Sequence, residues 1–388
     1  MSERARLVIL GSTVTALGVL RSAHDLGLRP VLVDNARGAA ADSRYGQKVL
    51  RPGAAPEAML EELMSLGRND QAALIADSDA WLRFIQAHRP GLEEAFTDIL
   101  HPGNATLSLC LDKEAFGEWC AQRGFLSPRT YFLKDDGSLA QKPEFPVLIR
   151  PRTTRHGVSG PVPKAVEVRN EGELEHWLQV FRESQAIPAV SQSLLRPGIR
   201  QYSVCLARNR QGEMVSFVAE KLRPIAEQCA TGSYVVLSPR AEVEAVGRKV
   251  AEQLDYYGIA EVEVLHDDAT GESFVIEVNA RPWAQYPLAH KSGHDFLTFL
   301  VRPADYDATR ERKTGFRWLS LESDLYAVFS RSIGLYPAGR IGVVEFMRSV
   351  LSANCFGLFA WSDPWPFARS SVRFLTEYGR SRRRVREP

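Results

Sequence analysis

Apolar and polar residues alternate twice in succession between residues 260 and 283, in the run AEVEVLHDDATGESFVIEVNARPW. In each half the apolar residues recur at every second position, which is the period of a β-strand with one buried face. The link HDDATGES is rich in turn-forming residues, with Thr270-Gly271 as its tightest point. The pattern therefore predicts a β-hairpin.

The polar positions of this hairpin carry candidate chemistry. Glu263 lies on the first strand. Glu277, Asn279 and Arg281 are spaced by two residues on the second strand, so their side chains project from one face. Carboxylate and amide oxygens are the hard ligands that Mg²⁺ prefers, and an arginine beside them suits a phosphate or another anion. Taken alone, the pattern also fits the solvated face of an ordinary hairpin, and both interpretations stay open here.

The start of the chain has the pattern of a strand, a helix and a second strand. Residues 7–10 form a short apolar run, residues 14–26 have the apolar spacing of a helix, and residues 30–34 form a second apolar run. The glycines between and within these elements do not form GxGxxG, so the dinucleotide fingerprint is incomplete and NAD is not favoured. Further along, the triplet 77–79 (DSD) predicts an N-cap for a helix at 80–87.

Basic residues stand at the ends of several elements predicted in the middle of the chain. Lys113 follows Asp112 at the head of a helix, and Arg150 ends an apolar strand. A hairpin predicted over 201–219 leads to Lys221 and Arg223, which alternate to the same face. Each of these residues also has an ordinary explanation, as a helix-surface lysine or as a charge on an edge strand.

The composition is that of an ordinary globular protein. The 388 residues are 45% hydrophobic and 24% charged, which is enough chain for two or three domains. The formal net charge of +1 gives no reason to expect a nucleic-acid partner. The five cysteines are scattered, there is no signal-peptide pattern and no apolar run is long enough to span a membrane. We therefore expect a cytoplasmic protein.

The C-terminal part predicts two apolar helices, at 325–335 and 341–358, separated by a Pro-Ala-Gly break. We favour packing of these helices on the main domain. Contact with a membrane surface is an alternative that we favour less. It is suggested by the terminal run GRSRRRVREP, which holds five arginines against one glutamate. A solvated basic tail explains that run equally well.

The motifs, taken in order, resemble those of the ATP-grasp superfamily over roughly residues 6–300. FVIEVNARPW after VEVLHDD is similar to the metal-binding end of these enzymes, and VSQSLLRPG at 190–198 is similar to their adenine hinge. The chain looks most like bacterial ATP-grasp carboxylate–amine ligases. The resemblance implies a mixed α/β (α+β) fold in four parts. These are a Rossmann-like domain at 1–105, two ATP-grasp subdomains at 106–190 and 191–301, and a mainly helical extension at 302–388.

The resemblance also implies a role for each candidate residue. Mg²⁺, with Mn²⁺ as an alternative, would be held by Glu263, Glu277 and Asn279. ATP would be contacted by Lys113, Arg150, Gln192, Ser193, Leu194 and Leu195. Catalysis, by stabilising negative charge on the reacting groups, would fall to Arg281, Lys221 and Arg223.

The implied reaction joins a small-molecule carboxylate to an amine through an acyl phosphate. Dimers are common in the family, so a homodimer is one expectation. Two departures from the family pattern are an arginine at 150, where a lysine is usual, and a serine at 193, where a glutamate is usual. The loop TTRHGVSGPVPK at 153–164, which the resemblance implies is the phosphate flap, also has few glycines. These departures leave open a nucleotide-binding protein without ligase activity. A kinase-like phosphoryl transfer within the same fold is a further alternative.

Overall fold

The computed structural model describes residues 5–70, 72–134, 137–153, 162–163, 165–194, 197–224, 232–330 and 341–373. The chain forms two compact units. The first unit combines Met1–Leu100, Ser233–Val235 and Pro282–Pro388, and the second combines His101–Gly232 and Val236–Arg281. Leu195, the glycines of the predicted phosphate flap and the basic run after residue 379 lie outside the described residues.

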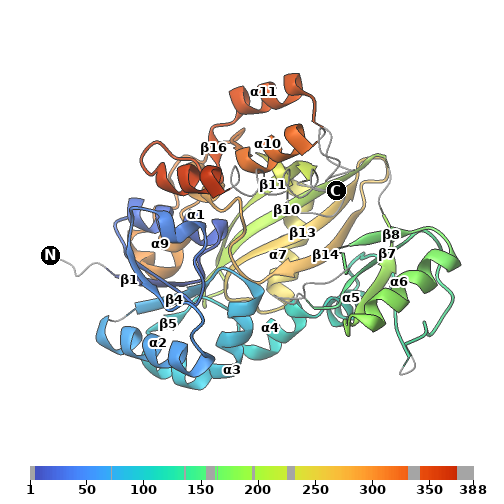
Figure 1. The fold of residues 1–388 in the computed structure, drawn as a ribbon, viewed down its shortest axis with the longest axis horizontal. Helices are drawn as coiled ribbons and strands as arrows, with labels where there is room; N and C mark the ends of the chain where they lie inside the picture. Colours follow the sequence, from blue (N-terminus) through green and yellow to red (C-terminus); the bar gives the residue numbers. More distant parts are fainter. Residues whose placement is uncertain are drawn as a thin grey trace, which may run out of the picture. The chain divides into compact units, whose positions relative to one another are not determined.

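A five-stranded parallel sheet organises the N-terminal part of the first unit, in the order β3-β2-β1-β4-β5. Helix α1 lies on one side of this sheet, and α2 and α3 lie on the other (Figure 1). The elements are β1 (Arg6–Leu10), α1 (Val14–Asp25), β2 (Arg29–Asp34), a 3-10 turn (Ala39–Asp42), β3 (Gln47–Leu50), α2 (Pro56–Asp70), β4 (Ala72–Ala76), α3 (Asp79–Ala95) and β5 (Asp98–Ile99). This arrangement confirms the predicted strand, helix and strand at the start of the chain.

The end of β4 meets the N-terminus of α1. The Asp77 carboxylate accepts a hydrogen bond from the Thr13 backbone N–H at 2.9 Å, and Gly11 has φ +104 where a Cβ would overlap the same carboxylate. Ser78, the N-cap residue of α3, makes no side-chain capping bond. The triplet 77–79 therefore supplies the N-cap residue of α3 as predicted, but without a side-chain capping bond, and Asp77 bonds to the start of α1 instead.

The C-terminal part of the first unit mixes helices with two short strands. Its elements are α8 (Pro287–Lys291), α9 (Phe296–Val301), a 3-10 turn (Pro303–Asp305), β15 (Arg317–Leu319), α10 (Leu321–Ser330), α11 (Val343–Ser352) and β16 (Cys355–Phe356). The helix predicted over 341–358 is thus wrong at its end. Cys355 is buried and pairs with Trp318 of β15 in a parallel register, so the chain leaves the helix after Ser352 to form a strand.

The second unit begins with two helices and a four-stranded antiparallel sheet in the order β6-β9-β7-β8. Its elements are α4 (Asn104–Leu111), α5 (Lys113–Gln122), β6 (Thr130–Tyr131), β7 (Val147–Pro151), β8 (Val166–Val168), α6 (Glu171–Glu183) and β9 (Pro188–Gln192). Helix α6 begins after Asn170, whose side chain accepts from the Glu173 backbone N–H. Leu174 and Phe181 from its apolar face pack into a core with buried residues of β7 and β9.

A seven-stranded sheet includes four antiparallel strands of this unit, which lie in the order β14-β13-β10-β11. Its elements and neighbours are β10 (Ile199–Arg208), β11 (Met214–Pro224), β12 (Gly232–Leu237), α7 (Ala241–Gln253), β13 (Gly258–Asp267) and β14 (Ser273–Asn279). Both predicted hairpins are confirmed. Helix α7 packs closely on β10, because Gly247 has no Cβ to meet Val204.

Candidate functional site

The site is built on the hairpin of β13 and β14. The register of these two strands decides which side chains stand opposite one another. Glu263 pairs directly with Glu277, and Glu261 pairs with Asn279, so four oxygen-bearing side chains stand on adjacent strands. The register shifts between Glu263 and Val264, immediately beyond these pairs. A bulge of this kind locally increases the strand twist and can re-aim the side chains beside it.

Lys221 of β11 is enclosed by two carboxylates of β13. Its Nζ lies 2.8 Å from Glu263 Oε1 and 3.7 Å from Glu261 Oε1, and the Lys221 side chain is only 6% exposed. Burial alone would lower the pKa of Lys221, but the Glu263 and Glu261 carboxylates outweigh burial and raise it. Burial raises the pKa of Glu261, and Lys221 opposes that rise. Lys221 is therefore held as a cation by the acidic face that it neutralises.

Polar neighbours fix the orientation of these carboxylates. Ser203 Oγ donates to Glu261 Oε1 at 2.5 Å, and Gln201 Nε2 donates to Glu263 Oε2 at 2.9 Å. Asn279 Nδ2 donates to Glu261 Oε2 at 3.0 Å and to Glu263 Oε1 at 3.3 Å, which turns its Oδ1 away from the carboxylates. That Oδ1 accepts a long hydrogen bond from Arg281 at 3.4 Å. The amide oxygen of Asn279 is thus turned away from the two carboxylates and toward Arg281.

Two basic side chains lie close to the Glu277 carboxylate. Its Oε2 lies 3.4 Å from Arg150 of β7 and 3.8 Å from Lys113 of α5. Three elements far apart in the sequence therefore bring Lys113, Arg150 and Glu277 together. Two cations at one carboxylate leave positive charge in excess at this point, which suits a polyphosphate.

Local contacts explain why Arg150, and not its neighbour Arg152, faces Glu277. Asp112 caps α5 by accepting from the N–H groups of Glu114 and Ala115, both at 3.1 Å. The same carboxylate takes Arg152 Nε at 2.9 Å and 3.0 Å through its two oxygens. Arg152 is held by this cap, while Arg150 points to the metal end of the site.

The predicted adenine end is described only in part. Gln192 ends β9, and its backbone N–H donates to the Arg129 carbonyl at 2.8 Å. Ser193 Oγ donates to Glu167 Oε1 at 2.6 Å, so this hydroxyl is engaged with β8. Leu194 is half-buried. Arg223 lies two residues after Lys221 on β11, as the alternation predicted.

Sequence reasoning missed Glu261, which the structure places at the centre of the acidic face. The signal was present in the run AEVEV, where Glu261 and Glu263 are spaced by two and must share a face. Gln201 and Ser203 of β10 were missed as well, because their partners lie some sixty residues further along the chain, at separations of 62 and 58. Only the pairing of β10 with β13 makes that relation visible.

The donor set fits a magnesium ion bound together with a nucleotide. Mg²⁺ is usually held by one or two carboxylates, with waters and substrate phosphates completing its shell. Glu263, Glu277 and the oriented amide oxygen of Asn279 supply such a set. No group of three or more His, Cys, Asp or Glu side chains placed to hold a metal unaided is found among the described residues.

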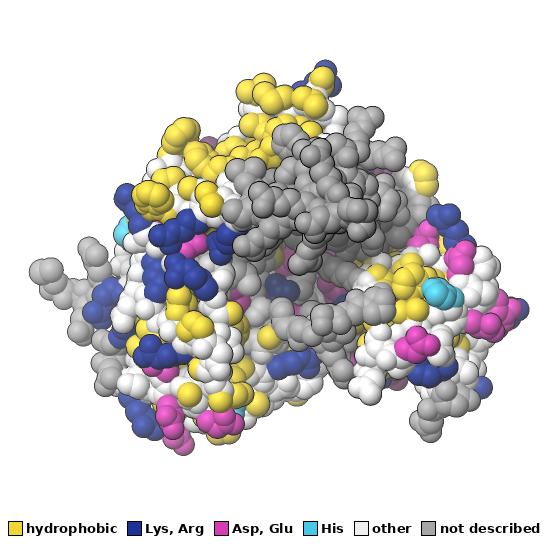
Figure 2. Space-filling model, viewed as in Figure 1, with side chains coloured by type: hydrophobic (Ala, Val, Ile, Leu, Met, Phe, Trp, Pro, Cys, Tyr) yellow, Lys and Arg dark blue, Asp and Glu magenta, His cyan; other side chains and the backbone are white. Residues whose placement is uncertain are grey.

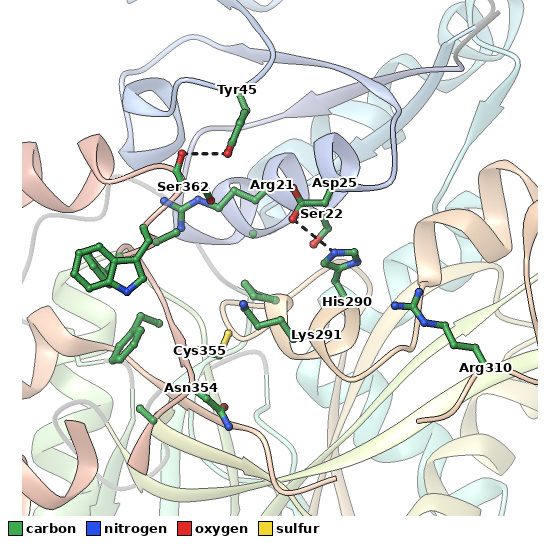
Figure 3. Close-up of a pocket in the computed structure, with 17 residues that line it drawn as sticks. Arg21, Ser22, Asp25, Tyr45, His290, Lys291, Arg310, Asn354, Cys355 and Ser362 are labelled. Atoms are coloured by element: carbon green, nitrogen blue, oxygen red, sulfur yellow. Dashed lines mark hydrogen bonds and ion pairs between the residues drawn. The ribbon is translucent and has the colours of Figure 1, made fainter. Parts of the chain in front are cut away.

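A cavity lies within the first unit, lined by residues of α1, α8 and the segment around β16 (Figure 3). It has a volume of about 700 Å³. One wall is aromatic, with Phe356, Phe359 and Trp361. Lys291 points into the space beside Cys355 (Figure 3), and among the described residues no ion-pair partner of Lys291 is found. The cavity therefore combines an apolar wall with a cation.

No family model and no curated protein matches the sequence. Solved structures do resemble the fold. An ADP complex of N5-carboxyaminoimidazole ribonucleotide synthetase matches with a TM-score of 0.65 and 14% identity, covering 86% of this chain and 87% of that one. The biotin carboxylase domain of Hydrogenobacter thermophilus 2-oxoglutarate carboxylase, solved with MgADP and bicarbonate, matches with 0.62 and 15%, covering 82% and 74%. The L-amino acid ligase of Bacillus licheniformis matches with 0.54 and 17%, covering 72% and 68%.

These structures are ATP-grasp enzymes, and they show that the chain has the ATP-grasp fold. The resemblance drawn from the sequence motifs is confirmed at this level. The carboxylate and cation cluster of β13, β14, β11, β7 and α5 lies entirely within the second unit of this fold.

Proposed function

We propose that the protein is an ATP-dependent carboxylate–amine ligase that forms an amide or peptide bond through an acyl phosphate and releases ADP and phosphate. The observation that carries the proposal is the paired Glu263 and Glu277 with an oriented Asn279, flanked by Lys113 and Arg150. The ATP-grasp fold supports the proposal, since neighbours with this fold are solved with ADP and with MgADP. The substrates would be small molecules.

Glu263, Glu277 and Asn279 would hold Mg²⁺, or Mn²⁺ in its place, together with the ATP phosphates. When bound, the metal would neutralise phosphate charge and so favour transfer of the γ-phosphoryl group. Arg150 and Lys113 reach the same carboxylate, and we expect both to turn to the phosphates when the nucleotide binds. Gln192 to Leu195 would border the adenine, as the hinge resemblance implies.

The remaining steps need positioning and charge stabilisation, and no protein nucleophile. The substrate carboxylate attacks the γ-phosphorus, the bond to the β-phosphate oxygen breaks, and ADP leaves. The amine then attacks the acyl carbon, phosphate leaves with the bonding electrons, and the amine loses a proton. Arg281 would stabilise the charged oxygens in both steps. Lys221 would keep the acidic face from repelling them, with Arg223 further along the same strand.

Phosphate release tests the proposal. Purified protein is incubated with ATP, Mg²⁺ and pools of amino acids and amines, with Glu277→Gln as the control that removes a metal ligand. Stimulated release by at least one pool, lowered about 100-fold or more in the control, is the expected result. If no pool raises release above the Glu277→Gln level, the protein is not a ligase for these classes of substrate.

One observation favours a second candidate, a nucleotide-binding protein without ligase activity. Serine replaces the glutamate usual at position 193, and its hydroxyl is bonded to Glu167. ATP binding by calorimetry with no stimulated phosphate release would favour this candidate. A phosphorylated product that survives hydroxylamine would instead indicate kinase-like transfer, because an acyl phosphate reacts with hydroxylamine. The four-part domain division and a homodimer belong to the ligase proposal as expectations.

A further inference from the structure

Exposed apolar side chains gather on one surface of the first unit. In the described part of the chain, eleven large hydrophobic side chains are exposed, and seven of them lie between residues 343 and 372. These seven define what we call the C-terminal apolar surface: Val343, Val344, Met347, Leu351, Trp361, Trp365 and Val372. Figure 2 shows hydrophobic side chains massed over α11 and over the neighbouring segment of the first unit.

Helix α11 presents its apolar side outward. Ser349 is buried, and Ser352 shares a hydrogen bond of 2.7 Å with the Tyr234 hydroxyl, whereas Met347 is 48% exposed and Leu351 is 80% exposed. A helix packed on a core normally does the reverse. The apolar pattern of this segment predicts packing on the main domain, but the described fold leaves this outward apolar stripe uncovered.

Trp361 of this surface packs against a cluster of aromatic rings. Trp361 is 90% exposed, and its ring lies 4.9 Å from that of Phe359 in an edge contact. Phe359 in turn contacts Phe356 and Phe367 at 5.9 Å and 5.6 Å. An exposed indole that contacts a cluster of half-buried rings is suited to the interface between water and lipid, where tryptophan is enriched.

The charge around this surface is positive. In the described stretch 341–373 there are three arginines, Arg348, Arg369 and Arg373, and no lysine, against two acidic residues, Glu345 and Asp363. Asp363 is fully buried, so it adds no exposed negative charge. Arg369 and Arg373 both bind the buried Asp42, which also binds Arg37, so three cations share one carboxylate. Figure 2 shows Lys and Arg side chains gathered next to the apolar patch.

We propose that the C-terminal apolar surface binds the surface of an anionic phospholipid membrane. Met347, Leu351 and Trp361 would enter the headgroup and acyl boundary, and the arginines would meet the anionic headgroups. A second copy of the chain fits this surface less well, because a twofold contact would bring the same arginines against one another. No helix of the described residues is long and apolar enough to cross a membrane.

Vesicle co-sedimentation tests the proposal with the full chain. Vesicles of phosphatidylcholine alone are compared with vesicles containing about one-third phosphatidylglycerol, at low and high salt. We expect binding to the anionic vesicles. Binding should fall clearly at 0.5 M salt, because the Debye screening length is then only about 3–5 Å. Leu351→Ser and Trp361→Ser should each lower the partition coefficient about fivefold or more. Arg348→Glu should remove most of the preference for anionic vesicles.

A matched control is available in the second unit. Ile187 is 55% exposed and lies outside the C-terminal apolar surface, so Ile187→Ser should leave vesicle binding unchanged. Equal binding of all variants, or no binding to anionic vesicles, would overturn the proposal. A dimer of the unaltered chain in ultracentrifugation that Leu351→Ser dissociates, together with no vesicle binding, would assign the surface to self-association instead. Because the proposal concerns the first unit alone, its failure leaves the ligase proposal untouched.

Discussion

Lys221 is surrounded by groups that could each have been taken as independent catalytic residues. Two carboxylates and one ammonium group, all nearly buried, compensate one another within 3.7 Å. Removing a single member of such a cluster leaves a buried charge without compensation, which costs far more than the surface pair it resembles. The acidic face is therefore a unit of three residues, and the role of any one of them depends on the other two.

His294 gives a prediction about pH. Burial, aided by Arg312, lowers the pKa of His294 to about 4, and Ser292 Oγ lies 2.8 Å from its Nδ1. The unfolded chain takes up this proton near pH 6.5, while the native protein does not until about pH 4, so stability falls as pH falls through that window. Between pH 7 and pH 5 this one residue should cost about 2 kcal/mol of unfolding free energy.

The measurement is urea unfolding of the unaltered protein and of His294→Gln at pH 7 and pH 5. The variant should lose about 2 kcal/mol less than the unaltered protein over this interval, whatever its stability at pH 7. Parallel pH dependences in the two proteins would contradict the assignment of this loss to His294.

At the scale of the element, the close approach of α7 to β10 can be tested. A Cβ at Gly247 would lie 2.4 Å from Val204 Cβ, which belongs to a buried strand and has little room to move. Alanine would gain about 1 kcal/mol of helix propensity, but overpacking of this kind costs about 1–3 kcal/mol. Gly247→Ala should therefore lower the free energy of unfolding, by about 1 kcal/mol.

Denaturant unfolding measures the effect, and two further variants separate its causes. Gly91→Ala in α3 meets only Met64 at 3.6 Å, an ordinary contact, so propensity should make it neutral or stabilising. Val204→Ala keeps its Cβ but removes the two γ-methyl groups that would lie 2.6 and 2.7 Å from the new Cβ, so adding it to Gly247→Ala should cost less than the two changes summed. Additive costs would argue against the close contact.

The elements show what the sequence pattern can and cannot predict. The hairpin over β13 and β14 followed from alternation and turn residues alone, because one strand follows the other and each buries one face. The end of α11 could not be predicted in this way. The apolar run continues past Ser352, whereas the strand at Cys355 depends on pairing with Trp318, 37 residues earlier. The same limit applies to the site. Spacing by two found Glu263, Glu277 and Asn279, whereas the contacts of Glu277 with Lys113 and Arg150 arise only from tertiary packing.

At the scale of the molecule, the first unit combines N-terminal and C-terminal segments of the described chain. Asp363, near the C-terminal end, bonds to residues of the N-terminal segment. Asp363 is fully buried and accepts from Arg21 Nε at 3.0 Å, Ser43 Oγ at 2.7 Å and the Arg44 backbone N–H at 2.9 Å. Asp363→Ala would leave the Arg21 guanidinium buried without its carboxylate. We expect a loss of about 3–5 kcal/mol in the free energy of unfolding.

Limited proteolysis beside urea unfolding checks this expectation, and the segment after β16 should become the first site of cleavage. Asp305→Ala provides the comparison. Asp305 is 59% exposed and pairs with Arg302 at 3.5 Å, so its loss should change stability by no more than about 0.5 kcal/mol. Similar losses of unfolding free energy in the two variants would mean that Asp363 does not stabilise the contact between the N-terminal and C-terminal segments.

The position of Asp363 has a consequence for the nascent chain. Arg21 leaves the ribosome 342 residues before its partner. At about 5–20 residues per second, the outer face of α1 stays incomplete for roughly 20–70 s of synthesis. The N-terminal sheet must either persist with an unsatisfied cation on that face or be guarded by a chaperone until the C-terminal segment arrives to complete it.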